Sequence, residues 1–481
     1  MSVRLLLFLM GRLSVLLGGA LCVPLLFYLW VPEGRPEAFV IPAALLLAAG
    51  GGILRLGDLP KTRLGVRESS FFLGLTWLLL AFAGMLPYVI DGQLGWLDAA
   101  FESISNFTTT GATCVVGDMP RPLLLWRSIT EWLGGLSAMV LLVTVMPQVS
   151  GIFGISFALG HTISLSPMLS RMRRTGVRIA KIYTGLTVLI FLCYILAGLE
   201  LFDAVNWAMI TLSTSGCYPT DRLLAFHRMP LELAAVLGML LASGNLVLYW
   251  NVLRCRDIRL LWRNAELKTF LGIVAACGLF IALHLWYLQF YDFRDSLRYG
   301  FFQAVSFAST TGYEAVDLSV WPDFDKYVLF LLTFIGGCIG APAGGFKVLR
   351  ILVLFRAAFA EMRRTLHPRM ILHISIDGHS VPLEIVVDIL GFFFLYFAIF
   401  FLFMLLIAFS GVPLLDAMGI AAACINGMGA ATVLYGTQGD FVSLSALTKS
   451  ICCLLMILGK LEIFAFLLVL QTSVRALRSR W

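Results

Sequence analysis

One short pattern occurs four times in this chain: two mostly hydroxyl-bearing residues and then a glycine, placed between a short apolar run and a long one. The copies end at Gly111, Gly216, Gly312 and Gly429, and the fourth copy has lost its hydroxyls. Glycine adopts positive φ without steric penalty, so the carbonyl before it can turn toward a shared axis. Four such segments, which we call glycine loops 1 to 4, would surround that axis with the oxygen atoms that replace the water shell of an alkali cation. A single Thr-Thr-Gly turn is common at a membrane edge, but four equivalent copies favour an ion site.

The composition places these loops in a membrane protein. Hydrophobic residues make up 60% of the 481 residues and charged residues only 13%, whereas about a quarter of an average soluble protein is charged. The net charge of +7 does not indicate nucleic-acid binding, because the basic residues lie in short loops between apolar segments. Phosphate-binding and dinucleotide-binding motifs are missing and the six histidines are scattered, so we expect no enzyme. A membrane-embedded enzyme or scaffold is the alternative from another class, and it would need acids or histidines inside the spans.

About 20 apolar residues are needed to cross a bilayer. Ten segments are expected to do so: 5–30, 38–54, 71–90, 127–147, 181–199, 231–252, 269–289, 327–355, 385–409 and 446–471. Shorter apolar stretches that end in the glycine loops are interpreted as re-entrant pore helices, since non-helical backbone at membrane depth must line a cavity or be buried in protein. The expected fold is an all-α polytopic membrane protein with ten transmembrane helices. Two N-terminal spans precede four pseudo-fourfold repeats, each made of a helix, a pore helix, a filter and a second helix.

The repeat also predicts the domain boundaries. They are 1–60 for the two leading spans, 68–155 and 170–262 for the first two pore repeats, 266–365 for the third, 366–383 for a cytosolic hairpin and 384–481 for the fourth repeat. Basic residues such as Arg171, Arg173 and Arg174 lie in alternate loops, and acids such as Glu314 and Asp317 lie in the opposite ones. By the positive-inside rule, both termini are cytoplasmic and the glycine loops open to the outside.

An aspartate marks the expected start of three pore helices. Asp98, Asp203 and Asp416 stand at the same distance before the glycines of their loops, whereas Asp295 in the third copy stands farther away. Aspartate is a favoured N-cap, and its carboxylate suits the positive end of a helix. We therefore expect the first three as N-caps of helices that aim their carbonyl ends at the glycine loops.

Two features interrupt the apolar pattern of the spans. Residues 336–345 carry several glycines and a central proline within span eight, so a continuous helix is excluded there. Such broken backbone normally lines a pathway, and a kink that serves only packing is the alternative. Lys460 lies near the middle of span ten, where a charge is expensive and indicates function; pairing with a buried carboxylate such as Glu131 is the alternative. Lys347 and Arg350 are expected to reach the cytoplasmic interface.

Two smaller predictions concern the loops between spans. The Asp377-Gly378 pair between two short apolar runs predicts a hairpin that projects into the cytosol, with a packed linker as the alternative. Cys114 and Cys217 lie just past glycine loops 1 and 2. A disulfide between them at the outer mouth is one possibility, but unpaired packing residues are the preferred interpretation.

Four stretches taken together resemble a known family. They are 107–113, 131–135, 336–352 and 459–462, with the sequences FTTTGAT, EWLGG, GGCIGAPAGGFKVLRIL and GKLE. The chain is similar in these stretches to the membrane subunits of Trk-type potassium uptake systems, in the TrkH branch of the Trk, Ktr and HKT cation transporters. The resemblance covers nearly the whole chain, including the two leading spans.

The resemblance implies which residues contact the ion and which form a gate. The expected filter residues are Thr109, Thr110, Gly111, Thr214, Ser215, Gly216, Thr310, Thr311, Gly312, Asn426, Gly427, Met428 and Gly429. In this superfamily a serine at the first filter position accompanies sodium preference, so the four glycines imply potassium (K⁺) as the transported ion. The expected gate is an intramembrane loop with a basic residue that faces the pore as an electrostatic barrier: Gly340, Ala341, Pro342, Ala343, Gly344, Gly345 and Lys460. Here Ala341-Pro342-Ala343 replaces the more usual hydroxyl and glycine residues.

The resemblance also implies a location and partners. It places the chain in the lipid bilayer of the bacterial cytoplasmic (inner) membrane, as a multi-pass protein and a homodimer with one pore per protomer. A TrkA-like cytosolic regulatory ring is the expected partner and carries the nucleotide, with the basic loops and the 366–383 hairpin as its docking surface. No covalently bound cofactor and no nucleic acid are expected. A sodium-permeable or cation-coupled symporter on the same scaffold is the alternative function.

Overall fold

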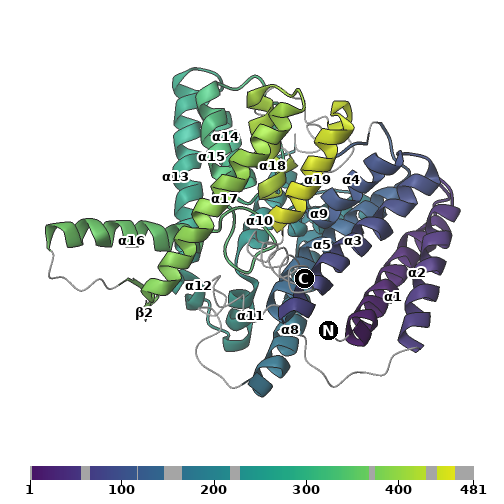
Figure 1. The fold of residues 1–481 in the computed structure, drawn as a ribbon. Coiled ribbons are helices and arrows are strands. Elements are labelled where there is room, and N and C mark those ends of the chain that lie inside the picture. Colours follow the sequence, from purple (N-terminus) through teal and green to yellow (C-terminus); the bar gives the residue numbers. More distant parts are fainter. Residues whose placement is uncertain are drawn as a thin grey trace.

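The computed structural model describes residues 3–55, 66–115, 117–145, 165–216, 228–367, 374–429 and 441–460. Helices make up nearly all of it, and the described residues contain one two-stranded sheet (Figure 1). The longer helices are α1 (Val3–Tyr28), α2 (Glu37–Arg55), α3 (Val66–Asp91), α5 (Arg121–Val145), α8 (Leu165–Leu196), α13 (Ala265–Tyr287), α16 (Val348–Leu366) and α17 (Leu383–Phe409). The shorter ones are α4 (Trp96–Phe107), α9 (Leu201–Ser213), α10 (Met229–Ser243), α11 (Leu246–Cys255), α12 (Arg259–Arg263), α14 (Phe293–Ala308), α15 (Asp323–Ile335), α18 (Leu414–Asn426) and α19 (Ala446–Lys460).

The chain is a mostly helical, multi-pass membrane protein. Within the described residues, six helices are long and apolar enough to cross a membrane, or seven if the bent pair α10 and α11 forms one span. Two of the ten expected spans, 127–147 and 446–471, lie partly outside the described residues. The count of ten therefore stays a prediction.

Small residues let the first two helices approach closely. A Cβ on Gly50 of α2 would lie 2.8 Å from the Gly11 carbonyl oxygen of α1, and one on Gly18 would lie 2.8 Å from Leu47 Cγ. Close backbone approach through small residues is the common way in which helices associate in lipid. This pair packs beside α3 and α5, at the edge of the bundle.

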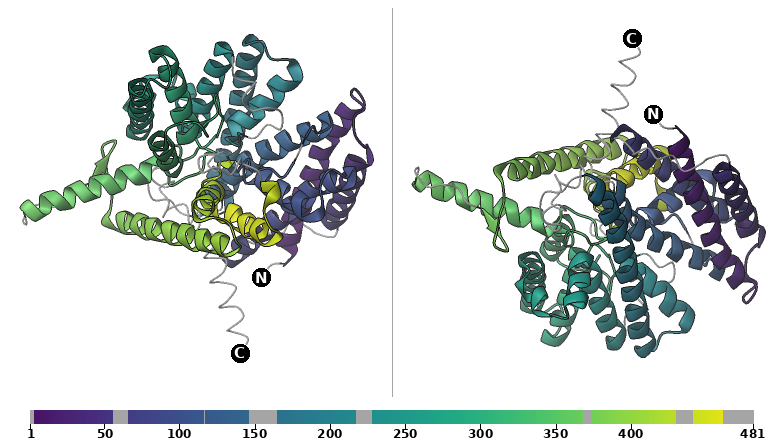
Figure 2. Two further views of the ribbon diagram at one scale, coloured as in Figure 1. Left: turned by 90° about the horizontal axis from the view of Figure 1, so that it is seen from above. Right: turned by 90° about the horizontal axis from the view of Figure 1, so that it is seen from below.

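Four groups of helices follow one another around a common centre. Each group joins a long helix, a short helix that ends in a glycine loop, and a third helix: α3–α4–α5, α8–α9–α10, α13–α14–α15 and α17–α18–α19. The third helix of each group packs on the short helix of the next, through the pairs α5–α9, α10–α14, α15–α18 and α19–α4. Viewed from above in Figure 2, the colours run around the centre in sequence order, and the yellow helices of the last group lie beside the blue helices of the first group. All four glycine loops are thereby brought to the middle.

The expected span at 231–252 is not one straight helix. The chain bends by 93° between α10 and α11, at Gly244 and Asn245. Asn245 starts the new helix, because its Oδ1 accepts from the amides of Val247 at 2.9 Å and Leu248 at 3.2 Å. This capping satisfies backbone donors that the bend would otherwise leave unpaired.

The aspartates of the short helices are not N-caps, which corrects the sequence prediction. The N-cap residues are Gly95, Glu200 and Pro413, so Asp98, Asp203 and Asp416 are each the third helical residue. Asp295 occupies the same third position of α14, which follows Asp292 as N-cap. The third copy differs because α14 has 16 residues where the others have 12 or 13, about one helical turn more. An acid in the first turn is favoured by the helix dipole in all four.

The Asp377-Gly378 turn is present and joins two short strands. Strand β1 (Ser375–Ile376) pairs antiparallel with β2 (His379–Ser380), and both turn residues have positive φ, 51° and 82°. This is the pattern of a two-residue hairpin turn that matches strand twist. The hairpin lies beside α16, which points away from the rest of the bundle (Figure 1).

Gly134→Ala is expected to lower the free energy of unfolding by about 3 kcal/mol, the upper range for overpacking. Its Cβ would overlap the carbonyl oxygen of Phe107, at the end of α4, and backbone cannot move aside as a side chain can. Gly185→Ala is the matched control, because nothing lies within 4 Å of its Cβ in α8. That control is expected to stabilise by about 0.5–1 kcal/mol. Thermal unfolding in detergent measures both, and equal melting temperatures for the two variants would contradict the packing.

Candidate functional site

The short helices α4, α9, α14 and α18 end in the same way. The residue before each loop glycine donates its amide to a carbonyl five residues earlier, as in a Schellman motif. The four bonds are Thr110 to Ser105 at 2.9 Å, Ser215 to Ile210 at 3.2 Å, Thr311 to Ser306 at 3.1 Å and Met428 to Ala423 at 2.9 Å. The degenerate fourth copy therefore has the backbone geometry of the other three.

A left-handed residue precedes that donor in every loop. It is Thr109 (φ 53°), Thr214 (φ 57°) and Thr310 (φ 56°) in loops 1 to 3, and Gly427 (φ 65°) in loop 4. A β-branched residue in this conformation costs about 1–3 kcal/mol, so the surroundings hold three strained threonines in place. Sequence reasoning missed this strain, although Gly427 at the equivalent place in copy four was the available signal.

The expectation of positive φ at every loop glycine holds for three of the four. Gly111, Gly216 and Gly312 have φ of 75°, 70° and 80°, whereas Gly429 lies outside the positive region. In loop 4 the glycine is needed because the backbone of loop 1 lies too close to leave room for a side chain. Its Cβ would lie 2.6 Å from the carbonyl carbon and oxygen of Gly111, and its amide donates to the Thr110 carbonyl at 2.6 Å.

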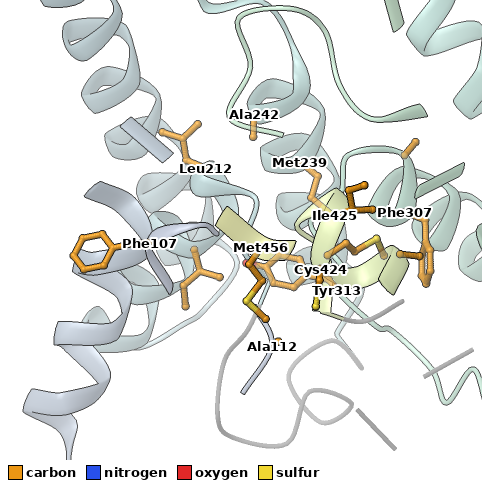
Figure 3. Close-up of a cluster of buried hydrophobic side chains, with 14 of the residues drawn as sticks. Phe107, Ala112, Leu212, Met239, Ala242, Phe307, Tyr313, Cys424, Ile425 and Met456 are labelled. Carbon is orange, nitrogen blue, oxygen red and sulfur yellow. The ribbon is translucent and has the colours of Figure 1, made fainter. Parts of the chain in front are cut away.

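The glycine loops meet backbone to backbone. Loop 4 contacts loop 1 through Gly429 and Thr110, and loop 2 contacts loop 3, where a Cβ on Gly216 would overlap the Thr311 carbonyl oxygen. The side chains of these loops are buried. Apolar side chains from the ends of all four short helices, among them Phe107, Leu212, Phe307 and Ile425, gather in the same region (Figure 3). The arrangement concentrates backbone carbonyl oxygens inside an apolar wall.

The threonine hydroxyls of glycine loops 1 and 3 have protein partners. Thr110 Oγ1 lies 2.8 Å from Thr108 Oγ1 in loop 1, and Thr311 Oγ1 lies 2.9 Å from Ser309 Oγ in loop 3. Thr109 Oγ1 accepts from Lys460 Nζ at 2.6 Å, and Thr310 Oγ1 accepts from the Gly344 amide at 2.9 Å. These contacts tie the strained threonines to α19 and to the segment between α15 and α16.

Span eight breaks where the sequence predicts. Helix α15 ends at Ile335 and α16 begins at Val348. We call the segment Gly336–Lys347 between them the α15–α16 loop. It lies against two glycine loops: the Gly344 amide binds Thr310 of loop 3, and a Cβ on Gly344 would overlap the Asn426 carbonyl oxygen beside loop 4. The broken backbone therefore sits at the centre of the bundle, in contact with the glycine loops.

Lys460 joins the same cluster. Its Nζ donates to Thr109 Oγ1 at 2.6 Å and to the Pro342 carbonyl at 3.0 Å, which connects glycine loop 1 with the α15–α16 loop. The alternative pairing with Glu131 is wrong. Glu131 is buried beside Arg127, whose Nε lies 3.6 Å from it and whose Nη2 lies 2.9 Å from Glu102.

Lys347 and Arg350 are buried, which contradicts the expectation that they reach the cytoplasmic interface. Lys347 Nζ donates to the carbonyls of Ala341, at 3.2 Å, and Ala343. It thereby closes the α15–α16 loop on itself. Arg350 lies over the ring of Phe392, 4.4 Å from its centroid. The carbonyls of the loop supply partners that sequence alone does not reveal.

The elbow between α10 and α11 also holds the α15–α16 loop. The Cys338 amide donates to the Ser243 carbonyl at 2.8 Å, and the Leu246 amide donates to the Gly340 carbonyl at 3.4 Å. The unexpected bend in α10–α11 thus has a cause, because it offers backbone groups to a loop that lacks helical hydrogen bonds of its own.

Two remaining predictions concern cysteines and metals. Cys114 is buried, and its Sγ lies 3.8 Å from the Phe441 carbonyl oxygen. Cys217 lies outside the described residues, so the pairing of the two stays untested. Within the part of the chain that the structure describes, no group of three or more His, Cys, Asp or Glu could hold a metal ion.

Comparison with known proteins gives one consistent match. The family model of TrkH, described as a cation transport protein, matches residues 36–474. The potassium uptake protein TrkH of Salmonella typhimurium is 31% identical over 468 residues, which cover 95% of this chain and 96% of that protein. TrkG of Escherichia coli is 31% identical over 93% of both chains. The crystal structure of the potassium transporter TrkH from Vibrio parahaemolyticus superposes with a TM-score of 0.88 at 29% identity, over 98% of this chain and 99% of that one.

Proposed function

Because this chain belongs to the TrkH family of cation transport proteins, which are transporters and not enzymes, we propose that it takes up potassium ions through a selectivity filter built from the four glycine loops. The convergence of the loops carries this proposal. Loop 4 meets loop 1 where the Gly429 amide binds the Thr110 carbonyl, and loop 2 meets loop 3 where Gly216 packs on the Thr311 carbonyl. The α15–α16 loop contacts loops 3 and 4 and so joins the two pairs. Rings of carbonyl oxygens replace the water shell of a dehydrated cation, and the relatives named above are potassium transporters.

The proposed architecture is ten transmembrane helices, with the four helix groups as pseudo-fourfold repeats around the pore. Its support is the closed cycle of contacts α5–α9, α10–α14, α15–α18 and α19–α4. Both termini lie in the cytoplasm and the glycine loops open to the outside. In the bacterial inner membrane, the inside-negative potential drives potassium inward by about 2.3 kcal/mol per charge per 100 mV. Uptake through the pore therefore needs no hydrolysis by this chain.

The α15–α16 loop is the proposed gate, with Lys460 as its electrostatic barrier. The positions of the α15–α16 loop and of Lys460 support this assignment. The loop contacts glycine loops 3 and 4, and Lys460 bridges glycine loop 1 and Pro342. A TrkA-like cytosolic ring that binds nucleotide regulates the gate, and the membrane chain forms a homodimer. For both partners the support is the family membership.

The test compares rubidium and sodium uptake into cells that lack potassium uptake, for the native chain and Gly111→Ser. The native chain is expected to take up rubidium and exclude sodium. Serine adds a side chain where φ is 75°, so it displaces the carbonyls of loop 1, and sodium leak should rise by about tenfold, the change for about 1.4 kcal/mol of lost discrimination. Equal sodium and rubidium uptake by the native chain would overturn the potassium assignment. Dependence of rubidium uptake on a second ion would establish the symporter instead.

A further inference from the structure

The first turn of α13 holds two segments that are distant in sequence. The Ala265 amide donates to Asp377 Oδ1 of the hairpin at 2.9 Å. The next residue, Glu266, accepts the amide of Ile339 in the α15–α16 loop at 2.5 Å through Oε1. Adjacent residues of one helix end therefore bind the hairpin on one side and the proposed gate on the other.

The carboxyl group of Glu266 is not needed to start the helix. Asn264 already caps α13, since its Oδ1 accepts the Leu267 amide at 2.8 Å. Glu266 is nevertheless only 3% exposed, and burying a carboxyl group is costly unless it is hydrogen-bonded. The Ile339 amide is such a partner, and it belongs to a segment without helical hydrogen bonds. Glu266 and the α15–α16 loop therefore satisfy each other.

The hairpin is attached to the gate segment a second time. Arg356 of α16 donates to the Ser375 carbonyl in β1, and α16 begins directly after the α15–α16 loop. Ile374, Ile376 and Val381 are buried, so the hairpin is packed and not loose. A displacement of the hairpin would thus act on the α15–α16 loop at two places. One is residue 339, through α13, and the other is the end of the loop after residue 347, through α16.

We propose that Glu266 is a positioning residue for the α15–α16 loop, and that the first turn of α13 couples the hairpin to this loop. A force on the hairpin is passed from Asp377 to Ala265, and from Glu266 to Ile339. The inference rests on the proposed function, because it takes the α15–α16 loop as the gate. It adds a route by which an event on the hairpin alters the rate of ion passage without contact with the glycine loops.

A double-mutant cycle tests the coupling in liposomes that contain the full chain. Asp377→Gly removes the acceptor and suits the positive φ of that position, whereas Asp377→Asn keeps Oδ1 and is the matched control. Glu266→Ala frees the loop and is expected to raise the initial rate of rubidium uptake about fivefold, the lower range of allosteric coupling. Asp377→Gly is expected to raise it less, about threefold, and Asp377→Asn to leave it unchanged. In the Glu266→Ala background, Asp377→Gly should add nothing.

Independent effects of the two substitutions, multiplying in the double variant, would overturn the coupling. An unchanged rate for Asp377→Gly would also overturn it. If Glu266→Ala does not insert, Glu266→Met, which fills a similar volume but offers no oxygen acceptor to the Ile339 amide, replaces it in the same cycle. Glu266→Gln keeps that acceptor and is the matched control, expected to stay near the native rate. The ratio of sodium to rubidium uptake should stay native throughout, since the glycine loops are untouched. A native chain that does not discriminate these ions would contradict the proposed function, whatever the cycle gives.

Discussion

Gly216→Ala is expected to abolish rubidium uptake, with a loss of at least about 100-fold, the effect of more than about 2.7 kcal/mol. Two independent features of the backbone lead to this result. The residue has φ of 70°, which favours glycine, and its Cβ would overlap the Thr311 carbonyl oxygen. The clash falls where glycine loop 2 meets loop 3, so one of the two loops must move. In the proposed filter, a displaced carbonyl no longer completes the ring of oxygen atoms that replaces the water shell of the ion.

Gly198→Ala is the matched control for Gly216→Ala, because it introduces the backbone strain of a positive φ without a clash against a neighbouring loop. Gly198 precedes α9 in the same repeat and has φ of 94°, but nothing lies within 4 Å of its Cβ. We expect a cost of about 1 kcal/mol in the free energy of unfolding and native rubidium uptake. Uptake assays at matched membrane abundance compare the two variants. Comparable uptake by both variants would mean that the contact between loops 2 and 3 is not part of the ion path.

The sequence predicts the parts of this fold that depend on local signals. Apolar length reveals the helices, and the glycines and Pro342 reveal the interruption after α15. The Asp377-Gly378 pair reveals the hairpin turn, because positive φ at two successive residues suits few other pairs. The equal placement of Asp98, Asp203 and Asp416 reveals the short helices, although each helix has its N-cap three residues before the aspartate that was expected there.

The features that the sequence did not predict depend on contacts between distant segments. The bend at Gly244 and Asn245 is stabilised by the α15–α16 loop, through the bond from Cys338 to Ser243. Two of the left-handed threonines are held by tertiary partners, Thr109 by Lys460 and Thr310 by Gly344. Glu266 was missed because a glutamate in the first turn of a helix is unremarkable in sequence. Only its burial against Ile339 distinguishes it.

Lys460 could be recognised only in part from the sequence. The sequence predicts that it is important, and the structure gives its partners. A lysine in an apolar span indicates function, yet its contacts with Thr109 and Pro342 could not be derived from α19 alone. Those contacts suggest two roles that differ in their physics. As the proposed barrier, the charge would repel a cation, and the two hydrogen bonds fasten the α15–α16 loop to glycine loop 1.

Lys460→Met is expected to raise rubidium uptake about tenfold, because both roles oppose flux. A unit charge near the path raises the barrier by about 1–2 kcal/mol at the effective dielectric of a protein, which is about 5–30-fold in rate. Lys460→Arg keeps the charge and is expected to stay near the native rate, and Lys460→Gln keeps a donor without the charge. If charge dominates, the glutamine variant matches methionine; if the hydrogen bonds dominate, it matches the native chain. Flux assays in liposomes measure all three, and a methionine variant at or below the native rate would rule out Lys460 as a barrier.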